Sequence, residues 1–228
     1  MAQEEYRDRL ERISRITLRP IGSPLPLGML GLGGASILLS GYQLSWLPAA
    51  QAHSIALVLL VFTLPMQYLA AVFGFLSRDG AGGTGMALLG SCWLVVGVLM
   101  LTSPPGSRSA TMGLLLFFAA AALLVPATAS ALGKVAAAVA FLLASGRFAL
   151  SGLYEYLGGS GWEHASGWVG LALCVVALYD AFAFEVEDTR HQTVLPVLRW
   201  GTGRRAMEGR VFPELVKVER EAGVREQL

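Results

Sequence analysis

Residues 109–157 read SATMGLLLFFAAAALLVPATASALGKVAAAVAFLLASGRFALSGLYEYL, and this stretch decides the fold. Its charged side chains are those of Lys134, Arg147 and Glu155, and its main polar interruption is the segment PATASALGK. A helix needs roughly 20 apolar residues to cross the hydrocarbon core of a bilayer. The 49-residue stretch is therefore too long for one tilted helix, and it predicts two membrane-spanning helices joined near Lys134.

The same apolar character continues on both sides of this stretch. Hydrophobic residues make up 54% of the 228 residues and charged residues 14%, whereas a soluble domain has about 25% charged residues. A membrane β-barrel would instead alternate apolar and polar residues along each strand. Glycine, proline and charged residues divide the apolar region into six segments, so we predict an all-α membrane protein with six transmembrane helices. The predicted spans are roughly 27–47, 53–76, 84–103, 110–128, 134–156 and 166–186.

Basic residues are distributed unequally between the predicted connections. With the N-terminus in the cytoplasm, fifteen of the 17 Lys and Arg residues lie on the cytoplasmic side, Arg108 lies outside and Arg147 lies within a span. Cytoplasmic connections of membrane proteins carry the excess of Lys and Arg. The sequence therefore predicts that both termini are cytoplasmic and that the protein is a multi-pass protein of the plasma membrane. The start of the chain lacks the apolar segment and cleavage site of a secretory signal.

Two tails flank the predicted membrane domain, which we place at residues 23–197. In the N-terminal tail, residues 1–22, Tyr6 and Leu10 begin an apolar stripe at helical spacing, with arginines between its members. This tail is either an amphipathic helix on the lipid surface or a solvated helix of mixed charge. The C-terminal tail, residues 198–228, is basic and polar and is expected in the cytosol.

Motifs of catalysis and of metal binding are missing from the sequence. Cys92 and Cys174 both lie within apolar runs, which predicts free, buried thiols. No metal-ligand spacing, phosphate-binding Gly-rich loop or Ser/His/Asp arrangement occurs. We therefore expect a protein that is not an enzyme and that has no metal, cofactor or nucleic-acid partner.

Three segments carry a resemblance to a known family. They are SPLPLGMLGLGG from Ser23, ASGWVGLALCVVALYDAF before the last span ends, and HQTVLP after it. Together with the six spans between them, they resemble the acetate uptake transporter family of bacterial acetate and succinate permeases and their fungal relatives. The resemblance covers about residues 22 to 197. The family's proline motif, Asn-Pro-Ala-Pro-Leu-Gly, is matched at Pro24, Pro26, Leu27 and Gly28, with Ser23 in place of the Asn.

Other positions both support the resemblance and depart from it. Gln67 and Trp93 match residues of the family in the second and third spans. Gly74 stands where relatives usually carry an acidic residue, and GAGGTG replaces the family's Gly-Asn-Thr-Phe-Gly loop. The resemblance implies hexamers of six-helix protomers, each with its own pore for carboxylates, working as a channel or with a proton. The implied partners are a small carboxylate solute, the lipid bilayer and further copies of the chain.

The resemblance also implies an apolar constriction, built in relatives from a Phe, a Tyr and a Leu on three spans. Alignment from the proline motif and from Gln67 places these positions at Leu32, Leu89 and Leu142. Three leucines would form a ring that gates by dewetting but lacks the phenol hydroxyl. The alternative is that these leucines face lipid or pack between helices.

Two polar features of the second and first spans have open interpretations. Gln67 either offers its amide to a solute or bonds to another helix. Pro65 beside it is expected to kink the helix. The proline motif has two interpretations. Prolines lack a backbone N–H, and irregular backbone in a membrane must be buried in protein or line water, so the motif could form a vestibule that faces the solute. Alternatively, it simply marks the start of a helix.

Arg147 is the most unusual residue, because a charge near mid-membrane costs from a few to more than about ten kcal/mol. It must be paired or face water. Asp180 is the candidate partner, although counting from the helix ends puts the two about 10 Å apart along the membrane normal. Alternatively, Arg147 faces the pathway and attracts carboxylates through its guanidinium. Both interpretations stay open.

A group of titratable residues is expected at the outer face. His53, Glu155, Glu163 and His164 either sense external pH or are ordinary polar loop residues.

Three functions are compatible with the sequence. The first is a membrane channel or transporter for acetate or other short-chain carboxylates, with or without a coupled proton. The second is a pore for a neutral solute such as urea or an amide, which a leucine constriction would tolerate. The third is a membrane interaction protein whose basic C-terminal tail is the working part.

Overall fold

The computed structural model describes residues 22–190, 192–199 and 204. The predicted N-terminal amphipathic helix and nearly all of the C-terminal tail lie outside these residues. Within them the structure is helical, and its one β-type contact is an isolated bridge between Lys134 and Arg199.

Six helical spans in the described part of the chain confirm the predicted all-α membrane architecture. Each is long and apolar enough to cross a bilayer. The spans are α2 (Leu25–Gln43); a second span made of η1 (Ala49–Gln51), α3 (Ala52–Val58), η2 (Leu59–Thr63) and α4 (Leu64–Leu76); α5 (Gly80–Thr102); α6 (Ala110–Ala131); α7 (Val135–Leu157); and α8 (Ser160–Arg190).

The last helix is longer than the sequence predicted, because apolar residues mark only its membrane-crossing part. Gly158 and Gly159 turn the chain with φ of 78° and 98°, so that α8 begins at Ser160 with a polar first turn. It then continues to Arg190, past the predicted limit at residue 186.

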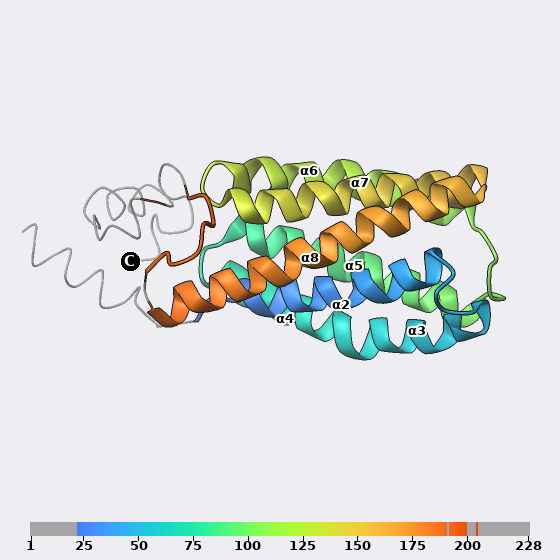
Figure 1. Cartoon of the computed structure of the whole chain (residues 1–228), viewed down its shortest axis with the longest axis horizontal. Coiled ribbons are helices and arrows are strands. Elements are labelled where there is room, and N and C mark those ends of the chain that lie inside the picture. Colours follow the sequence, from blue (N-terminus) through green and yellow to red (C-terminus); the bar gives the residue numbers. More distant parts are fainter. Residues whose placement is uncertain (1–21, 191, 200–203, 205–228) are drawn as a thin grey trace, which may run out of the picture.

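The helices form an elongated bundle in which α6 and α7 lie along one side and α2 lies beside α8 (Figure 1). Gly22 and the end of α8 lie at the same end of the bundle, which we call the terminal end. The loop 103–109 lies at the other end, which we call the loop end. Helices α2 and α8 are antiparallel, since Gly33 of α2 lies against Ala177 of α8, whereas Gly167 of α8 lies against Gln43 of α2.

The proline motif builds the start of α2 and its closest contact. Pro24 is the N-cap and Pro26 lies in the first turn, where a missing backbone N–H costs nothing. A Cβ added at Gly28 would lie 2.6 Å from the sulfur of Met86 and 2.9 Å from the Cβ of Ala70. Gly28 therefore lets α2 approach α4 and α5 closely, as small residues do between membrane helices.

The second span is irregular at its centre. Residues Leu59–Thr63 form a π-helix, and Pro65 follows directly in the first turn of α4. Proline cannot donate the hydrogen bond that an α-helix requires, and π-helical turns inside longer helices are frequent at functional sites. The kink expected at Pro65 therefore takes the form of a π-helical segment. It lies opposite Gly31 of α2, where an added Cβ would lie 3.4 Å from the Thr63 carbonyl oxygen.

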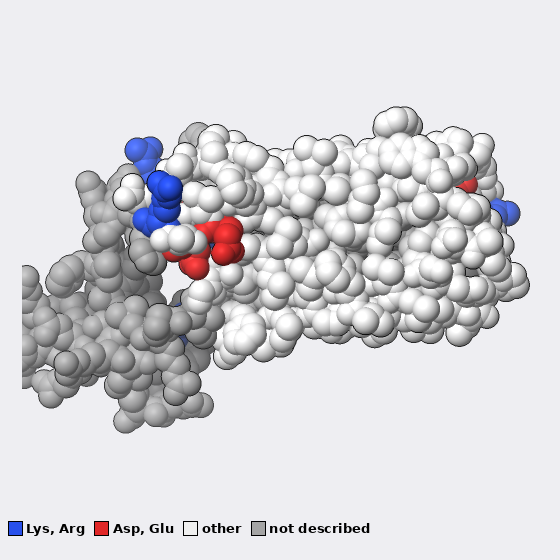
Figure 2. All heavy atoms as spheres, turned by 60° about the horizontal axis from the view of Figure 1, so that its bottom comes forward, with Lys and Arg blue, Asp and Glu red and all other residues white. Residues whose placement is uncertain are grey.

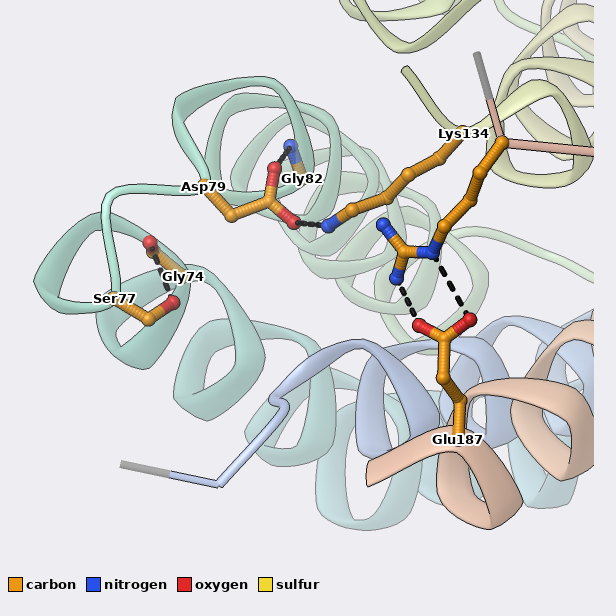
Figure 3. A network of polar contacts seen from close by, with 7 residues as sticks. Gly74, Ser77, Asp79, Gly82, Lys134 and Glu187 are labelled. Carbon is orange, nitrogen blue, oxygen red and sulfur yellow. Dashed lines mark hydrogen bonds and ion pairs between the residues drawn. The ribbon is translucent and has the colours of Figure 1, made fainter. Parts of the chain in front are cut away.

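Ion pairs tie the terminal end together (Figure 3). Asp79 caps α5 by accepting a hydrogen bond from the Gly82 N–H at 3.1 Å, and its other oxygen pairs with Lys134 Nζ at 2.6 Å. Beside this pair, Arg199 binds the carboxylate of Glu187 near the end of α8. The first pair joins the starts of α5 and α7, and the second joins Arg199, in the segment after α8, to Glu187 of α8 itself.

The segment 192–199 returns from α8 to the start of α7. Val197 is fully buried, and its carbonyl accepts a hydrogen bond from the Ala136 N–H at 3.4 Å. Tyr179 donates a hydrogen bond to the Pro196 carbonyl at 3.1 Å. The TVLP sequence thus forms an ordered strap across part of the terminal end.

The flank of the bundle is suited to lipid. On the face shown in Figure 2, Lys, Arg, Asp and Glu side chains occur only near the two ends, and the length between them is uncharged. Large apolar side chains of the spans are exposed, among them Val61, which is 74% exposed, and Val175, which is 68% exposed. Such a continuous apolar surface is rare on soluble monomers and is typical of a surface that contacts lipid or another protein.

Candidate solute pathway

A cavity of about 160 Å³ opens among the helices at the loop end. Its walls come from α2, α5, α6, α7 and α8 and from the loop 103–109. The residues that reach deepest along these helices are Trp93, Arg147 and Phe148, which form its floor. By the volume that one water occupies, the cavity has room for roughly ten waters.

Arg147 on the cavity floor is a buried cation. Its side chain is 1% exposed, and its Nη1 and Nη2 donate to the Ser36 carbonyl at 3.3 Å and to Gln43 Oε1 at 3.2 Å. Among the described residues, ion pairs join Lys134 to Asp79 and Arg199 to Glu187, and none includes Arg147. The guanidinium is therefore oriented by neutral groups and lacks a carboxylate partner in the described part of the chain.

A glycine makes room for this guanidinium. A Cβ added at Gly170 of α8 would lie 2.6 Å from Cζ of Arg147, and it would also collide with the Ser40 hydroxyl. The guanidinium thus packs directly on the backbone of α8. Any larger residue at position 170 would push it from this place.

The hypothetical ion pair with Asp180 is not formed. Arg147 meets α8 at Gly170, and Asp180 lies ten residues further along that helix, about 15 Å away along its axis. Asp180 is itself fully buried, with neither carboxylate oxygen hydrogen bonded among the described residues. Counting from helix ends underestimated the offset, because the helices do not end at the same depth.

A track of buried polar groups leads from the cavity floor into the bundle. These groups have no hydrogen-bond partner among the described residues. They are the hydroxyls of Ser40, Ser36 and Thr63, the indole N–H of Trp93 and both amide atoms of Gln67. Buried polar atoms are almost always satisfied by protein or water. In a membrane protein, such a row is expected where water or a polar solute passes.

Gln67 marks the inner end of this track. Its side chain lies between two glycines, with Cγ 3.3 Å from a Cβ placed on Gly31 and Cβ 3.5 Å from one placed on Gly90. From Ser40 to Gly31 the track advances nine residues along α2, or about 14 Å.

Two of the three predicted gate leucines lie at the level of Gln67. Leu32 follows Gly31 on α2 and Leu89 precedes Gly90 on α5, and both side chains are fully buried. Their enclosed position on neighbouring helices is compatible with the predicted constriction, which stays a prediction.

The structure does not place the third predicted gate residue with the other two. Leu142 is 50% exposed on the outer surface of α7. The neighbouring Phe141 is fully buried instead, and its ring packs on Gly85 of α5. A shift of one residue turns a helical side chain by about 100°, so an alignment uncertain by one position exchanges an inward residue for an outward one.

The remaining predicted residues fall at opposite ends of the bundle. The proline motif, Ser23 to Gly28, lies at the terminal end and away from the cavity. At the loop end, Glu155 and Glu163 line the cavity mouth, whereas His53 and His164 are exposed and are not part of its lining. The charge of His164 still acts on the neighbouring Glu163, so Glu155, Glu163 and His164 lie near one another, and no contact joins His53 to them among the described residues.

Several site residues escaped the sequence analysis. Gln43 accepts from Arg147 and donates to Ser151 at 3.2 Å, which makes it the residue that orients the guanidinium. Ser36, Ser40 and Gln43 stand at helical spacing in an otherwise apolar span. That spacing predicts a polar stripe on one face of the helix and would have identified them.

Comparison with known proteins gives one structural relative of note. No family model and no curated protein matches the sequence. The fold is similar to that of the bacterial acetate channel SatP, with a TM-score of 0.68 and 24% sequence identity. The match covers 77% of this chain and 98% of that channel. The two proteins share the six-helix membrane fold.

Proposed function

We propose that this protein is a membrane channel or transporter for acetate and other short-chain carboxylates. The proposal rests on the position of Arg147. This buried cation lies on the floor of a cavity and has no carboxylate partner among the described residues. A charge in such a place is costly unless an anion or water compensates it. A carboxylate of the solute supplies that compensation.

The donors around the floor suit a carboxylate. A guanidinium has five N–H donors, and Arg147 uses two of its N–H groups on Ser36 and Gln43 within the described part of the chain. Donors therefore remain for the two oxygens of one carboxylate, which a guanidinium binds in a planar, bidentate pair. The indole N–H of Trp93, also without a partner there, adds a neutral donor.

The proposed pathway runs from the cavity along the polar track to Gln67 and passes between Leu32 and Leu89. The amide of Gln67 replaces part of the solute's hydration, and the leucines exclude bulk water. The fold shared with SatP, which is described as an acetate channel, supports the same solute class.

The placement in the membrane follows the distribution of basic residues. We propose that the loop end faces outside and that both termini are in the cytoplasm, within the plasma membrane. The cavity then receives solute from the outer solution. The hexamer implied by the family resemblance remains part of this proposal, and the apolar flank offers the surface for it.

Uptake of labelled solutes into proteoliposomes tests the function. Acetate, propionate, succinate and urea are compared with and without an imposed pH gradient. We expect saturable uptake of acetate and propionate, and accumulation driven by the gradient would identify a coupled proton. Urea flux without carboxylate flux would instead indicate a pore for neutral solutes. The observation that favours such a pore is that the buried side chains of Gln67, Leu32 and Leu89, which lie at one depth in the bundle, are uncharged.

A further inference from the structure

The cavity mouth carries a cluster that an anion pathway does not need. Glu155 at the end of α7 and Glu163 in the first turn of α8 line it, together with the phenols of Tyr42 and Tyr154. The charges of both glutamates act on both phenols, so the four groups lie close together. Two carboxylates at the mouth repel a simple carboxylate that approaches the floor.

The groups of this cluster are those that recognise an ammonium ion. Carboxylates pair with its charge, and the faces of tyrosine rings attract cations. Glu155 also accepts the Ser109 N–H at 2.7 Å, which fixes the position of its carboxylate. Arg108, which packs on Gly158 at the same rim, offsets part of the charge of Glu155, and His164 acts in the same way on Glu163 when its imidazole is protonated.

The floor and the mouth carry opposite charges at different depths of the cavity, and the rise along α7 gives the scale of their separation. Glu155 follows Arg147 by eight residues on α7, or about 12 Å along the helix axis; the two positions are turned by about 80° from each other around that axis, and both side chains line the cavity. Each ion pair with a ligand takes up about 3 Å. About 6 Å then remains between the ligand's own charges, the length of a chain with three or four methylene groups.

From this arrangement we infer that the cavity binds short ω-amino carboxylates, with the carboxylate on Arg147 and the ammonium group between Glu155 and Glu163. The inference deepens the proposed function and rests on it for transport. A second observation supports a ligand at the floor: the indole N–H of Trp93, 1% exposed, lines the cavity and has no partner among the described residues. The apolar middle of the cavity, with Leu39, Val96 and Met112, suits the methylene chain.

Competition against labelled acetate uptake tests the inference. Unlabelled butyrate, 4-aminobutyrate, 5-aminopentanoate and glycine are compared in proteoliposomes containing the full chain. We expect 4-aminobutyrate or 5-aminopentanoate to inhibit at concentrations about tenfold lower than butyrate, and glycine, which is too short, to inhibit less than either. Equal inhibition by butyrate and both ω-amino acids, with acetate uptake intact, overturns the inference and leaves the proposed function standing.

Substitution of the mouth carboxylates locates the effect. Glu163→Gln removes one charge with little change in shape, and Glu155→Gln serves as the second variant if the first fails to fold. We expect either to bring the ratio of butyrate to 4-aminobutyrate inhibition constants close to one. Glu185→Gln, exposed on α8 near the terminal end, is the control and keeps the ratio of the natural protein. A ratio unchanged in both mouth variants overturns the inference.

Ligand-induced thermal stabilisation of the purified protein separates the two proposals. If no carboxylate crosses the membrane but 4-aminobutyrate still stabilises the protein, and does so less in Glu163→Gln, the proposed transport fails and the binding site stands. If 4-aminobutyrate neither stabilises the protein nor inhibits acetate uptake, the proposed binding site is excluded, whether or not acetate is transported.

Discussion

Replacing Arg147 with methionine separates a solute-binding role from a structural one. Methionine keeps much of the volume and apolar stem of arginine but removes the charge. The structure gives the guanidinium donors for two bonds to one carboxylate beyond those to Ser36 and Gln43. At about 1.5 kcal/mol or more for each charge-assisted hydrogen bond, the loss is about 3 kcal/mol of solute binding. Since about 1.4 kcal/mol corresponds to a factor of ten, acetate affinity falls by about 100-fold.

The same substitution has a different effect on folding. It leaves Gln43 Oε1 without its Arg147 donor, while the Ser36 carbonyl keeps the N–H of Ser40 within α2. The lost hydrogen bond costs about 1–3 kcal/mol, but the substitution also removes a buried charge with a desolvation penalty of several kcal/mol. We therefore expect the thermal unfolding temperature in detergent to stay the same or rise while uptake is lost.

Concentration-dependent acetate uptake and thermal unfolding of the same preparations measure the two effects. Arg190→Met, which removes one charge from an exposed position at the end of α8, is the matched control and should alter neither. Arg147→Lys keeps the positive charge but lacks the planar guanidinium. Its acetate affinity should therefore lie between those of the natural protein and Arg147→Met. Undiminished acetate affinity in Arg147→Met would exclude a solute-binding role for the guanidinium, and loss of the folded protein in that variant would show a structural role instead.

Further substitutions probe the rest of the pathway. Gly170→Leu places a side chain where the guanidinium lies and should lower acetate uptake at least about tenfold, while Gly146→Leu, at an exposed glycine with open space, leaves uptake unchanged. Gln67→Leu removes the polar group between Gly31 and Gly90, so it should slow uptake at saturating acetate more than it changes affinity at the Arg147 site. Leu32→Phe with Leu89→Tyr narrows the proposed constriction and should reduce propionate flux more than acetate flux; equal reduction of both would argue against a gate at this level. Lys134→Met breaks a partly exposed ion pair with Asp79 and should cost about 1 kcal/mol or less in unfolding experiments without changing solute selectivity.

The membrane fold was predictable because hydrophobic length alone determines it. The stretch from residue 109 to residue 157 cannot be accommodated as one helix, and the turn at Lys134 follows from that fact. Local backbone irregularity was predictable only in part. Pro65 predicts a disturbance of the helix, but no local pattern predicts that the disturbance is a π-helical segment at Leu59–Thr63 packed opposite Gly31.

The sequence predicted those parts of the candidate site in which a single residue is unfavourable in a membrane whatever its neighbours are. Arg147 stands out in any apolar span because of its charge, but its neighbours depend on the relative depths of α7 and α8. Because of those depths, the guanidinium contacts Gly170 of α8 and not Asp180, the partner that the sequence suggested. Leu142 shows the limit of alignment on a helix, since a one-residue error moves a side chain from the interior to the lipid face.

The proposed function depends above all on the binding of the solute carboxylate to Arg147. Solid-state NMR of the reconstituted protein, with isotopic labels in the acetate carboxyl carbon and in the arginine guanidinium nitrogens, measures this contact directly. We predict a dipolar coupling that corresponds to a carbon–nitrogen distance of about 4 Å or less, present in the natural protein and absent in Arg147→Met. Bound acetate without such a coupling, or with a coupling that persists in Arg147→Met, would contradict the claim.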